Sequence, residues 1–188
     1  TCVMNFGVAS ASEIVALPRF DLDDALKLIN KQKPHFFPAV PAIYNAINNH
    51  KDIDTFDLSS IEYCISGGAP LPVEVKKAFE GNTGCVVVEG YGLTESSPVA
   101  SGNPIFAENV AGSIGLPFPN TVIEIVDKDD KTTPIAQGER GEICIRGPQV
   151  MKGYWKNEDA TADTIRDGNR LHTGDIGIMD ENGYVFIV

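Results

Sequence analysis

The sequence predicts an α/β protein, in which part of a parallel sheet layer is followed by a small antiparallel β subdomain. In the first hundred residues, short apolar runs alternate with segments of helical periodicity. One of these runs, Cys85–Val88, is apolar at every position, which is typical of a strand buried on both faces. Beyond about residue 104, β-branched runs separated by turn residues indicate a second, β-rich part.

A helix is expected in the stretch FDLDDALKLINKQKP. Asp21 is its N-cap candidate, acidic residues occupy the first turn, and Pro34 ends it. The apolar residues recur at helical spacing, at Leu22, Ala25, Leu26 and Ile29. A second helix is predicted in PAIYNAINNH, with Pro41 in its first turn.

A strand–helix–strand unit follows these helices. IEYCIS is predicted to be a strand, GGAPLP a turn, PVEVKKAFE a helix and CVVVEG a second strand. This order indicates a βαβ unit with parallel strands that are covered on both faces.

The last part of the chain is expected to form a small antiparallel sheet or barrel. TVIEIVD, RGEICIRG and GYVFIV have the β-branched or aromatic character of strands. The DENG sequence before the last of them indicates a hairpin, and one helix is expected to begin at Asn157. We therefore place the α/β portion at residues 1–104 and the β-rich subdomain at residues 105–188.

Composition and charge exclude several classes of protein. The net charge of -11, with no local cluster of lysine and arginine, argues against a nucleic-acid partner. No apolar stretch approaches the roughly 18 residues of a transmembrane segment, and the opening lacks the basic region of a signal peptide. The four cysteines form no C-x-x-C pair, and a metal site built from the three scattered histidines is not expected. We expect Cys64 and Cys85 to be buried thiols in a cytoplasmic protein.

Two glycine turns are expected at one edge of the parallel sheet, where open α/β sheets bind their ligands. The first contains Gly67 and Gly68. These glycines could serve only to turn the chain, or they could let backbone amides approach a ligand. The second turn lies in VEGYGLTESSP, at the end of the next strand.

The second turn carries side chains suited to a nucleotide. Tyr91, between Gly90 and Gly92, is better placed to stack on an aromatic ring than to pack in a core. Thr94 offers a hydroxyl, and Glu95 offers a hard oxygen ligand of the kind that Mg²⁺ takes together with phosphate oxygens. The alternative is that Thr94 and Glu95 begin a capped helix.

Three residues of the β-rich part have competing interpretations. Asp175 follows a glycine in RLHTGD, where an acid is by default a turn residue but could also accept the vicinal hydroxyls of a ribose. His172 in the same stretch is expected to be a packing or loop residue. Trp155, after an alternating strand and a Gly-Pro turn, is expected in the core rather than at a ligand.

Five ordered motifs resemble those of the adenylate-forming superfamily: GGAPLP, VEGYGLTESSP, GSIGLPFPN, RGEICIRGPQVMKGYW with NEDAT, and LHTGDIG. Over essentially its whole length the chain is similar to acyl-CoA synthetases, the fatty-acid–CoA ligases related to coumarate–CoA ligases and beetle luciferases. The resemblance implies part of the N-terminal domain of such an enzyme. It also implies the substrates ATP, coenzyme A and a small carboxylic acid, with Mg²⁺. The acid would attack ATP to give acyl-AMP and pyrophosphate, and the sulfur of coenzyme A would then displace AMP.

The resemblance also implies roles for individual residues. Tyr91 would stack on adenine and Asp175 would bind the ribose hydroxyls. Thr94 and Glu95 would be the catalytic residues, with Thr94 at the α-phosphate and Glu95 on Mg²⁺. The glycine turns would complete the nucleotide site through Gly67, Gly68, Ala69, Gly90 and Gly92. The acyl pocket would be lined by Gly68, Gly90 and Gly92.

Two parts of the family pattern are missing from this sequence. They are the upstream phosphate loop with its lysine, and the downstream domain that carries the adenylation lysine. The chain is therefore expected to be an internal fragment that is inactive alone, from a protein that could be membrane-peripheral through its other regions. Exposed apolar surface beside VMNFGVA is expected to favour self-association.

Two alternatives stay open for the function. One is an amino-acid adenylation domain of a peptide synthetase, but such domains usually hold the substrate amine with an acid, and Phe36, Phe37 and Ala39 offer none. The other is a nucleotide-binding module without catalysis. For the ligase, the absence of a side chain at Gly92, where acetate-activating relatives carry tryptophan, predicts a medium- to long-chain or aryl substrate. Gly92→Trp should then shift the preference toward short acids.

Overall fold

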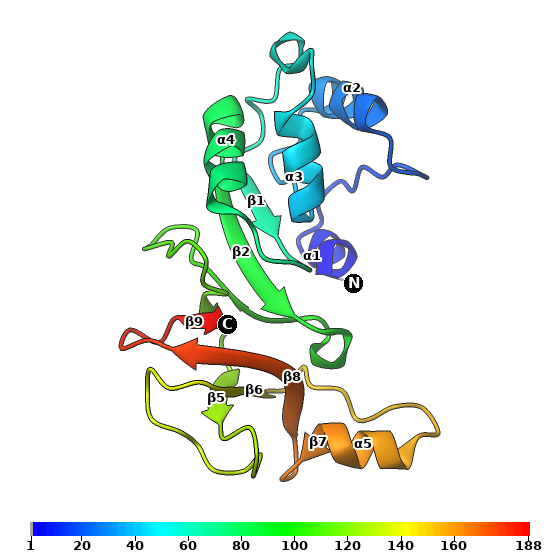
Figure 1. Ribbon diagram of the computed structural model, residues 1–188. Coiled ribbons are helices and arrows are strands. Elements are labelled where there is room, and N and C mark those ends of the chain that lie inside the picture. Colours follow the sequence, from blue (N-terminus) through cyan, green and yellow to red (C-terminus); the bar gives the residue numbers. More distant parts are fainter. Residues whose placement is uncertain (1) are drawn as a thin grey trace. The chain divides into compact units, whose positions relative to one another are not determined.

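The computed structural model describes residues 2–188, which form two compact units (Figure 1). The first unit runs to Glu89 and includes Ile105–Ala107, and the second contains Gly90–Pro104 and Glu108–Val188. The architecture is mixed α/β, with parallel strand pairing in the first unit and antiparallel sheets in the second, so the predicted fold class is confirmed. No helix of the described residues is both long and apolar enough to cross a membrane.

The first unit contains four α-helices and a 3-10 turn among its described residues, and both predicted early helices are present. Its elements in chain order are α1 (Cys2–Ala9), α2 (Leu22–Gln32), α3 (Pro41–Asn48), η1 (Ile53–Thr55), β1 (Tyr63–Ser66), α4 (Val73–Thr83) and the first part of β2 (Val86–Gly92). Asp21 caps α2 as expected, because its carboxylate accepts a hydrogen bond from the amide of Asp24 at 3.0 Å. Pro41 begins α3, where its missing N–H has no cost.

The predicted βαβ unit is confirmed by the pairing of its strands. β1 and β2 pair in parallel, from Tyr63 opposite Val86 to Ser66 opposite Glu89. Around them lies an apolar core that includes Leu26, Ile29, Tyr44, Ile47, Ile61, Phe79 and Val87. The thiols of Cys64 and Cys85 are buried in this core with their sulfurs 3.7 Å apart, as expected for small buried side chains.

The α1 helix was not predicted, and most of its apolar side chains face solvent. Val3, Met4, Phe6 and Val8 are all exposed. The expected apolar surface beside VMNFGVA is therefore present, while self-association through it stays a prediction.

The second unit is built around antiparallel strands. Its elements in chain order are the end of β2, η2 (Thr94–Ser96), β3 (Val99–Gly102), β4 (Leu116–Pro117), β5 (Val122–Val126), β6 (Gly141–Arg146), α5 (Glu158–Thr164), β7 (Ile165–Arg166), β8 (Arg170–Met179) and β9 (Val185–Ile187). The larger sheet has the order β5-β6-β8-β7, and β9 also pairs with β8. Its core is aliphatic and includes Ile123, Ile125, Ile143, Ile145, Leu171 and Val185.

The predicted hairpin and the predicted helix start of this unit are both confirmed. The DENG sequence joins β8 to β9, with Met179 opposite Val185. Asn157 caps α5 through a hydrogen bond from the amide of Ala160. The subdomain boundary placed at residue 104 stays a prediction, although the contacts within the chain divide it at Glu89.

Candidate functional site

The Gly-Tyr-Gly segment lies in a strand, so the expectation of a turn at this point is wrong. β2 continues through Gly92, and its last residues pair with β3, Gly90 opposite Gly102 and Tyr91 opposite Ser101. A local shift of register follows Tyr91, and Gly92 lies opposite Val99. The backbone of the segment remains extended because β3 supplies a hydrogen-bonding partner.

Gly92 is required by a close approach of the backbone, which corrects the expectation that its missing side chain serves to leave the acyl pocket open. A Cβ atom at this position would lie 1.7 Å from the carbonyl oxygen of Pro98 and 2.8 Å from the Cα of Val99. Gly90 differs, because a Cβ there would meet its nearest atom, the carbonyl oxygen of Ser101, at an ordinary 3.6 Å. A side chain at Gly92 therefore collides with the chain itself before it can reach any pocket.

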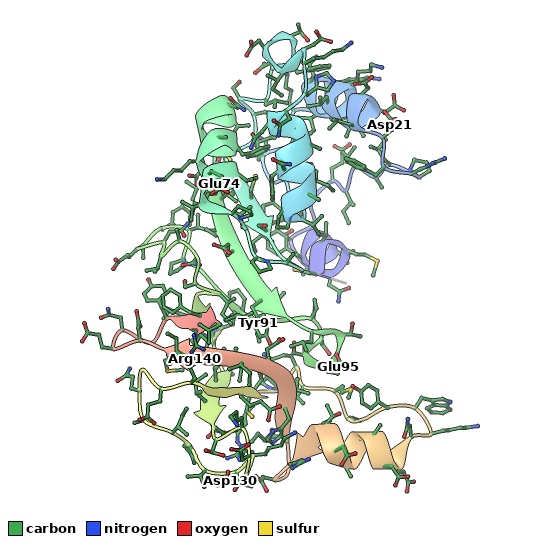
Figure 2. The ribbon with its side chains drawn as sticks, viewed as in Figure 1. Asp21, Glu74, Tyr91, Glu95, Asp130 and Arg140 are labelled. Carbon is green, nitrogen blue, oxygen red and sulfur yellow. The ribbon has the colours of Figure 1, made fainter. Side chains whose placement is uncertain are left out.

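Tyr91 is anchored at both ends of its side chain. It is half-buried against the apolar core of the second unit, so the expectation that it is poorly placed for packing is wrong. Its hydroxyl donates a hydrogen bond of 2.5 Å to Oδ2 of Asp175. Burial, together with this bond to a carboxylate, raises the pKa of Tyr91 well above its usual range. Figure 2 shows Tyr91 and Glu95 along the same stretch of chain.

The raised pKa of Tyr91 predicts a pH-dependent contribution to stability. A group that holds its proton more tightly when folded stabilises the protein fully below its unfolded pKa, here about 10, and loses this contribution as the pH rises toward the folded value. We expect Tyr91→Phe to lower the free energy of unfolding by about 1–3 kcal/mol at neutral pH. Urea denaturation should show this difference shrinking above about pH 10. A difference that stays constant with pH would contradict this account.

Asp175 lies inside a strand rather than beyond a turn, which corrects the expectation from RLHTGD. β8 runs unbroken from Arg170 to Met179, and its register against β6 shifts around Asp175. Gly174 has a φ of 77°, a backbone conformation that side chains rarely adopt, so glycine permits the irregularity. Asp175 itself is half-buried, with its carboxylate on the hydroxyl of Tyr91.

Thr94 and Glu95 form a single 3-10 turn, so the alternative of a capped helix is realised only as this short element. The hydroxyl of Ser96 holds the turn, accepting from the amide of Leu93 at 2.9 Å and donating to the carbonyl of Pro98 at 2.7 Å. Thr94 is exposed and Glu95 is half-buried. The turn thus carries an exposed hydroxyl and a half-buried carboxylate at consecutive positions.

Glu95 has a hydrogen-bonding partner that the sequence reasoning missed. Oε1 of Glu95 accepts a hydrogen bond of 2.7 Å from the hydroxyl of Tyr154, and its backbone carbonyl accepts one of 2.8 Å from the amide of Met151. The bond to Glu95 raises the pKa of Tyr154. The KGYW motif was the available signal, but its tyrosine is 59 residues from Glu95 and no local pattern links the two.

Trp155 is 88% exposed, so the expectation that it lies in the core is wrong. The indole instead has the ammonium group of Lys156 over its ring, 5.7 Å from the centroid. The segment between β6 and α5 turns its tyrosine toward Glu95 and leaves the next side chain in solvent.

The first glycine turn is confirmed in the first unit. Gly67 and Gly68 follow β1, and Gly68 has a φ of 81°, which explains the glycine. Gly68 and Ala69 are exposed and Gly67 is half-buried. The amide of Leu71, after the turn, donates to the buried carboxylate of Glu89 at 3.4 Å. These residues belong to the first unit, whereas Tyr91, Thr94, Glu95 and Asp175 belong to the second.

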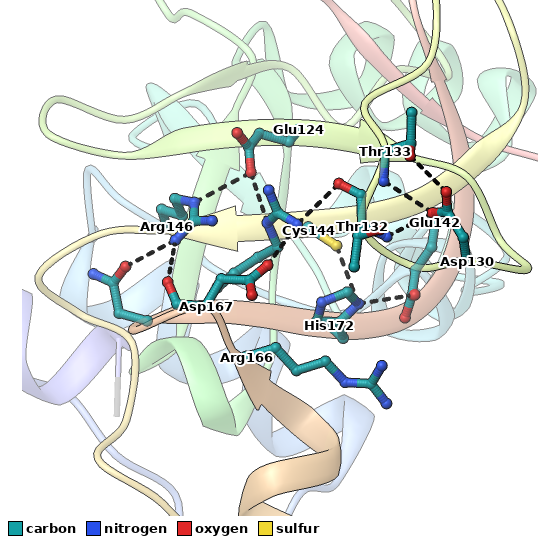
Figure 3. A network of polar contacts seen from close by, with 12 residues as sticks. Glu124, Asp130, Thr132, Thr133, Glu142, Cys144, Arg146, Arg166, Asp167 and His172 are labelled. Carbon is teal, nitrogen blue, oxygen red and sulfur yellow. Dashed lines mark hydrogen bonds and ion pairs between the residues drawn. The ribbon is translucent and has the colours of Figure 1, made fainter.

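His172 is buried, as expected for a packing residue, and is part of a polar cluster with Glu142 and Cys144 (Figure 3). Its Nδ1 lies 3.0 Å from Oε2 of Glu142 and 3.4 Å from the sulfur of Cys144. Among the described residues, this is the group of three whose ligand atoms lie close enough together, within 4.8 Å, to hold a metal ion.

Comparisons with known proteins match this chain to a family model and to curated relatives. The family model described as AMP-binding enzyme matches residues 1–155. A long-chain-fatty-acid–CoA ligase of Bacillus subtilis is 48% identical over 187 residues, which cover 100% of this chain and 33% of that protein. One from Salmonella typhimurium is 40% identical with the same coverage. The chain thus spans about a third of the length of these curated relatives.

Solved structures with this fold are also known. The ATP-bound structure of MatB from Rhodopseudomonas palustris matches with a TM-score of 0.87 and 29% sequence identity. The match covers 98% of this chain and 36% of that protein. The similarity therefore extends through both units of the chain.

Proposed function

Because the chain belongs to the AMP-binding enzyme family, we propose that the full-length protein is a long-chain fatty-acid–CoA ligase. It would activate a carboxylic acid with ATP to acyl-AMP and then transfer the acyl group to coenzyme A. The observation that carries this proposal is the pairing of Tyr91 with Asp175 in a chain that is 48% identical to such a ligase.

Tyr91 and Asp175 are proposed to bind the nucleoside of ATP. The phenol ring would stack on adenine, because its apolar body is fixed by the core and its face can meet a second ring. The carboxylate of Asp175 would accept hydrogen bonds from the ribose hydroxyls. The hydroxyl of Tyr91 already holds one oxygen of this carboxylate, so it would orient the group before the nucleotide arrives. That MatB was solved with ATP supports a nucleotide as the ligand.

Glu95 is proposed to hold Mg²⁺, and its surroundings fit this role. Oε1 of Glu95 accepts a hydrogen bond from the hydroxyl of Tyr154. Oε2 accepts no hydrogen bond from the described residues and can serve as a metal ligand. One or two carboxylates together with phosphate oxygens are the usual ligands of Mg²⁺ in proteins. When bound, the ion would neutralise charge on the phosphates of ATP. Tyr154 would keep the carboxylate in one orientation.

The remaining proposed roles concern position more than chemistry. The exposed hydroxyl of Thr94 would donate to the α-phosphate as negative charge develops there. Gly67, Gly68 and Ala69 would bring the backbone close to the nucleotide, and Gly68 and Gly90 would leave room for the acyl chain. Gly92 would contribute through its backbone alone, given the contact with Pro98. The acid oxygen would attack the α-phosphorus and release pyrophosphate, after which the thiolate of coenzyme A would displace AMP.

The test is an assay of the full-length protein with ATP, Mg²⁺, coenzyme A and a series of acids from acetate to long-chain fatty acids. We expect ATP-dependent formation of acyl-CoA with medium or long chains preferred over acetate. Pyrophosphate exchange that depends on amino acids, with no acyl-CoA formed, would favour the amino-acid adenylation alternative. ATP binding without turnover of any acid would favour a non-catalytic module.

Asp175→Ala should weaken ATP binding in the same protein. The loss of charge-assisted hydrogen bonds to the ribose is expected to cost about 1–3 kcal/mol of binding free energy. Calorimetry with ATP measures the effect directly, and Asp163→Ala, a change of an exposed acid on α5 in the same unit, is the control. Equal affinities for wild type and Asp175→Ala would remove Asp175 from the proposed site.

A further inference from the structure

The irregular part of β8 that carries Asp175 is held by a buried carboxylate. The regular pairs Glu142–Ile176 and Cys144–His172 enclose one residue of β6, Ile143, but three residues of β8. Thr173, Gly174 and Asp175 thus lie opposite one residue of β6, so β8 has two extra residues and bulges away from β6 at this point. Bulges of this kind re-aim side chains, and here the side chain is that of Asp175.

Both oxygens of Glu142 are used to hold this bulge. Oε1 accepts a hydrogen bond of 3.0 Å from the amide of Gly174, and Oε2 lies 3.0 Å from Nδ1 of His172. Glu142 is only 4% exposed, so its charge is compensated inside the protein by these donors. The contact with Glu142 is important for the orientation of the His172 ring, because the other ring nitrogen, Nε2, is buried without a hydrogen-bonding partner among the described residues.

Hydrogen bonds within the bulge connect it to Asp175. The hydroxyl of Thr173 donates to the carbonyl of Ile143 at 2.8 Å and accepts from the amide of Asp175 at 3.1 Å. A continuous set of hydrogen bonds thus runs from Glu142 through the backbone of β8 to the residue that pairs with Tyr91. A bulge with an exposed glycine at its tip would otherwise have several conformations available.

We propose that Glu142 is a positioning residue, whose buried carboxylate fixes the bulge of β8 and so sets the direction in which Asp175 presents its carboxylate to a ribose. This inference rests on the proposed function for the role of Asp175. Glu142 touches no substrate and acts through Gly174 and His172. A metal ion in the same cluster of Glu142, Cys144 and His172 is the competing interpretation, which the test distinguishes.

The test measures ribose discrimination in the full-length protein, as the ratio of dissociation constants for 2′- or 3′-deoxy-ATP and for ATP. We expect a ratio on the order of 10- to 100-fold for the wild type, and a ratio near one for Asp175→Ala. Glu142→Gln keeps the shape of the side chain but cannot accept hydrogen bonds from both the amide of Gly174 and Nδ1 of His172. This variant should therefore lose most of the discrimination between ATP and its deoxy analogues. Thr173→Ala removes the hydroxyl that bonds Ile143 and Asp175, so it should lose the discrimination as well. It is the second variant to measure if Glu142→Gln does not fold.

Glu124→Gln is the matched control. Glu124 lies in the same sheet and forms ion pairs with Arg146 and Arg170, at 3.2 and 3.0 Å (Figure 3). Among the described residues, these ion pairs do not include any residue of the bulge. This variant should melt at a lower temperature but discriminate like the wild type, which separates positioning from general destabilisation.

Three results would overturn the proposal. Wild-type discrimination in folded Glu142→Gln, with discrimination lost in Asp175→Ala, would remove Glu142 alone and leave the proposed function intact. Wild-type discrimination in Asp175→Ala would instead remove the ribose role of Asp175, and the role of Glu142 with it. Finally, one equivalent of Zn²⁺ that raises the melting temperature of the wild type but not of Cys144→Ala would make Glu142 a metal ligand.

Discussion

Glu95→Gln is expected to slow the adenylation half-reaction of the full-length protein on the order of 100-fold, because it removes the charge that would hold Mg²⁺ beside the phosphates. Glutamine has the same size as glutamate, and its amide oxygen can still accept the hydroxyl of Tyr154. The fold should therefore survive with its melting temperature nearly unchanged. Pyrophosphate release measured in single turnovers reports the step directly.

The dependence on Mg²⁺ distinguishes this prediction from a general loss of activity. If Glu95 is a ligand, the variant should need a higher Mg²⁺ concentration for half-maximal rate as well as losing rate at saturation. Glu158→Gln is the control, since Glu158 is an exposed acid in the first turn of α5, in the same unit. A normal rate with a normal Mg²⁺ requirement in Glu95→Gln would rule out the metal role.

Gly92→Ala is expected to lower the free energy of unfolding by about 3 kcal/mol, the upper part of the range for overpacked sites. The added methyl group would lie 1.7 Å from the carbonyl oxygen of Pro98, so the backbone of the next strand would have to move. Gly90→Ala, two residues earlier in the same strand, is the matched control because its methyl group has ordinary contacts. Chemical denaturation of both variants beside the wild type measures the difference.

The close approach of Pro98 to Gly92 also changes the result expected for Gly92→Trp. Sequence reasoning expects this substitution to close the acyl channel and favour short acids. The structure instead leads us to expect that the indole displaces the backbone at Pro98 and Val99, so that stability falls before selectivity can change. A stable Gly92→Ala protein with wild-type denaturation would show that the close approach can relax and would restore the earlier expectation.

The sequence by itself determined the local elements and the family. Asp21 and Asn157 cap helices, Pro41 begins one, and the DENG stretch closes a hairpin, because these signals act over a few residues. The continuous apolar run before Glu89 likewise indicated a strand in a parallel pair. Five ordered motifs were enough to indicate the adenylate-forming family. Each motif is a local pattern, and the order of the motifs can be read in the sequence without the tertiary structure.

Only the tertiary structure decided how the candidate site is built. Gly-Tyr-Gly is strand because β3 pairs with it, Asp175 projects from a bulge because Glu142 holds Gly174, and Tyr154 reaches Glu95 across 59 residues. The contacts of Glu142 with Gly174 and of Tyr154 with Glu95 join residues 32 and 59 positions apart, so no periodicity or turn signal encodes them. Trp155 could not be placed from the sequence for the same reason. An aromatic residue after a strand is buried only if the fold brings other apolar side chains against it, and Trp155 is exposed.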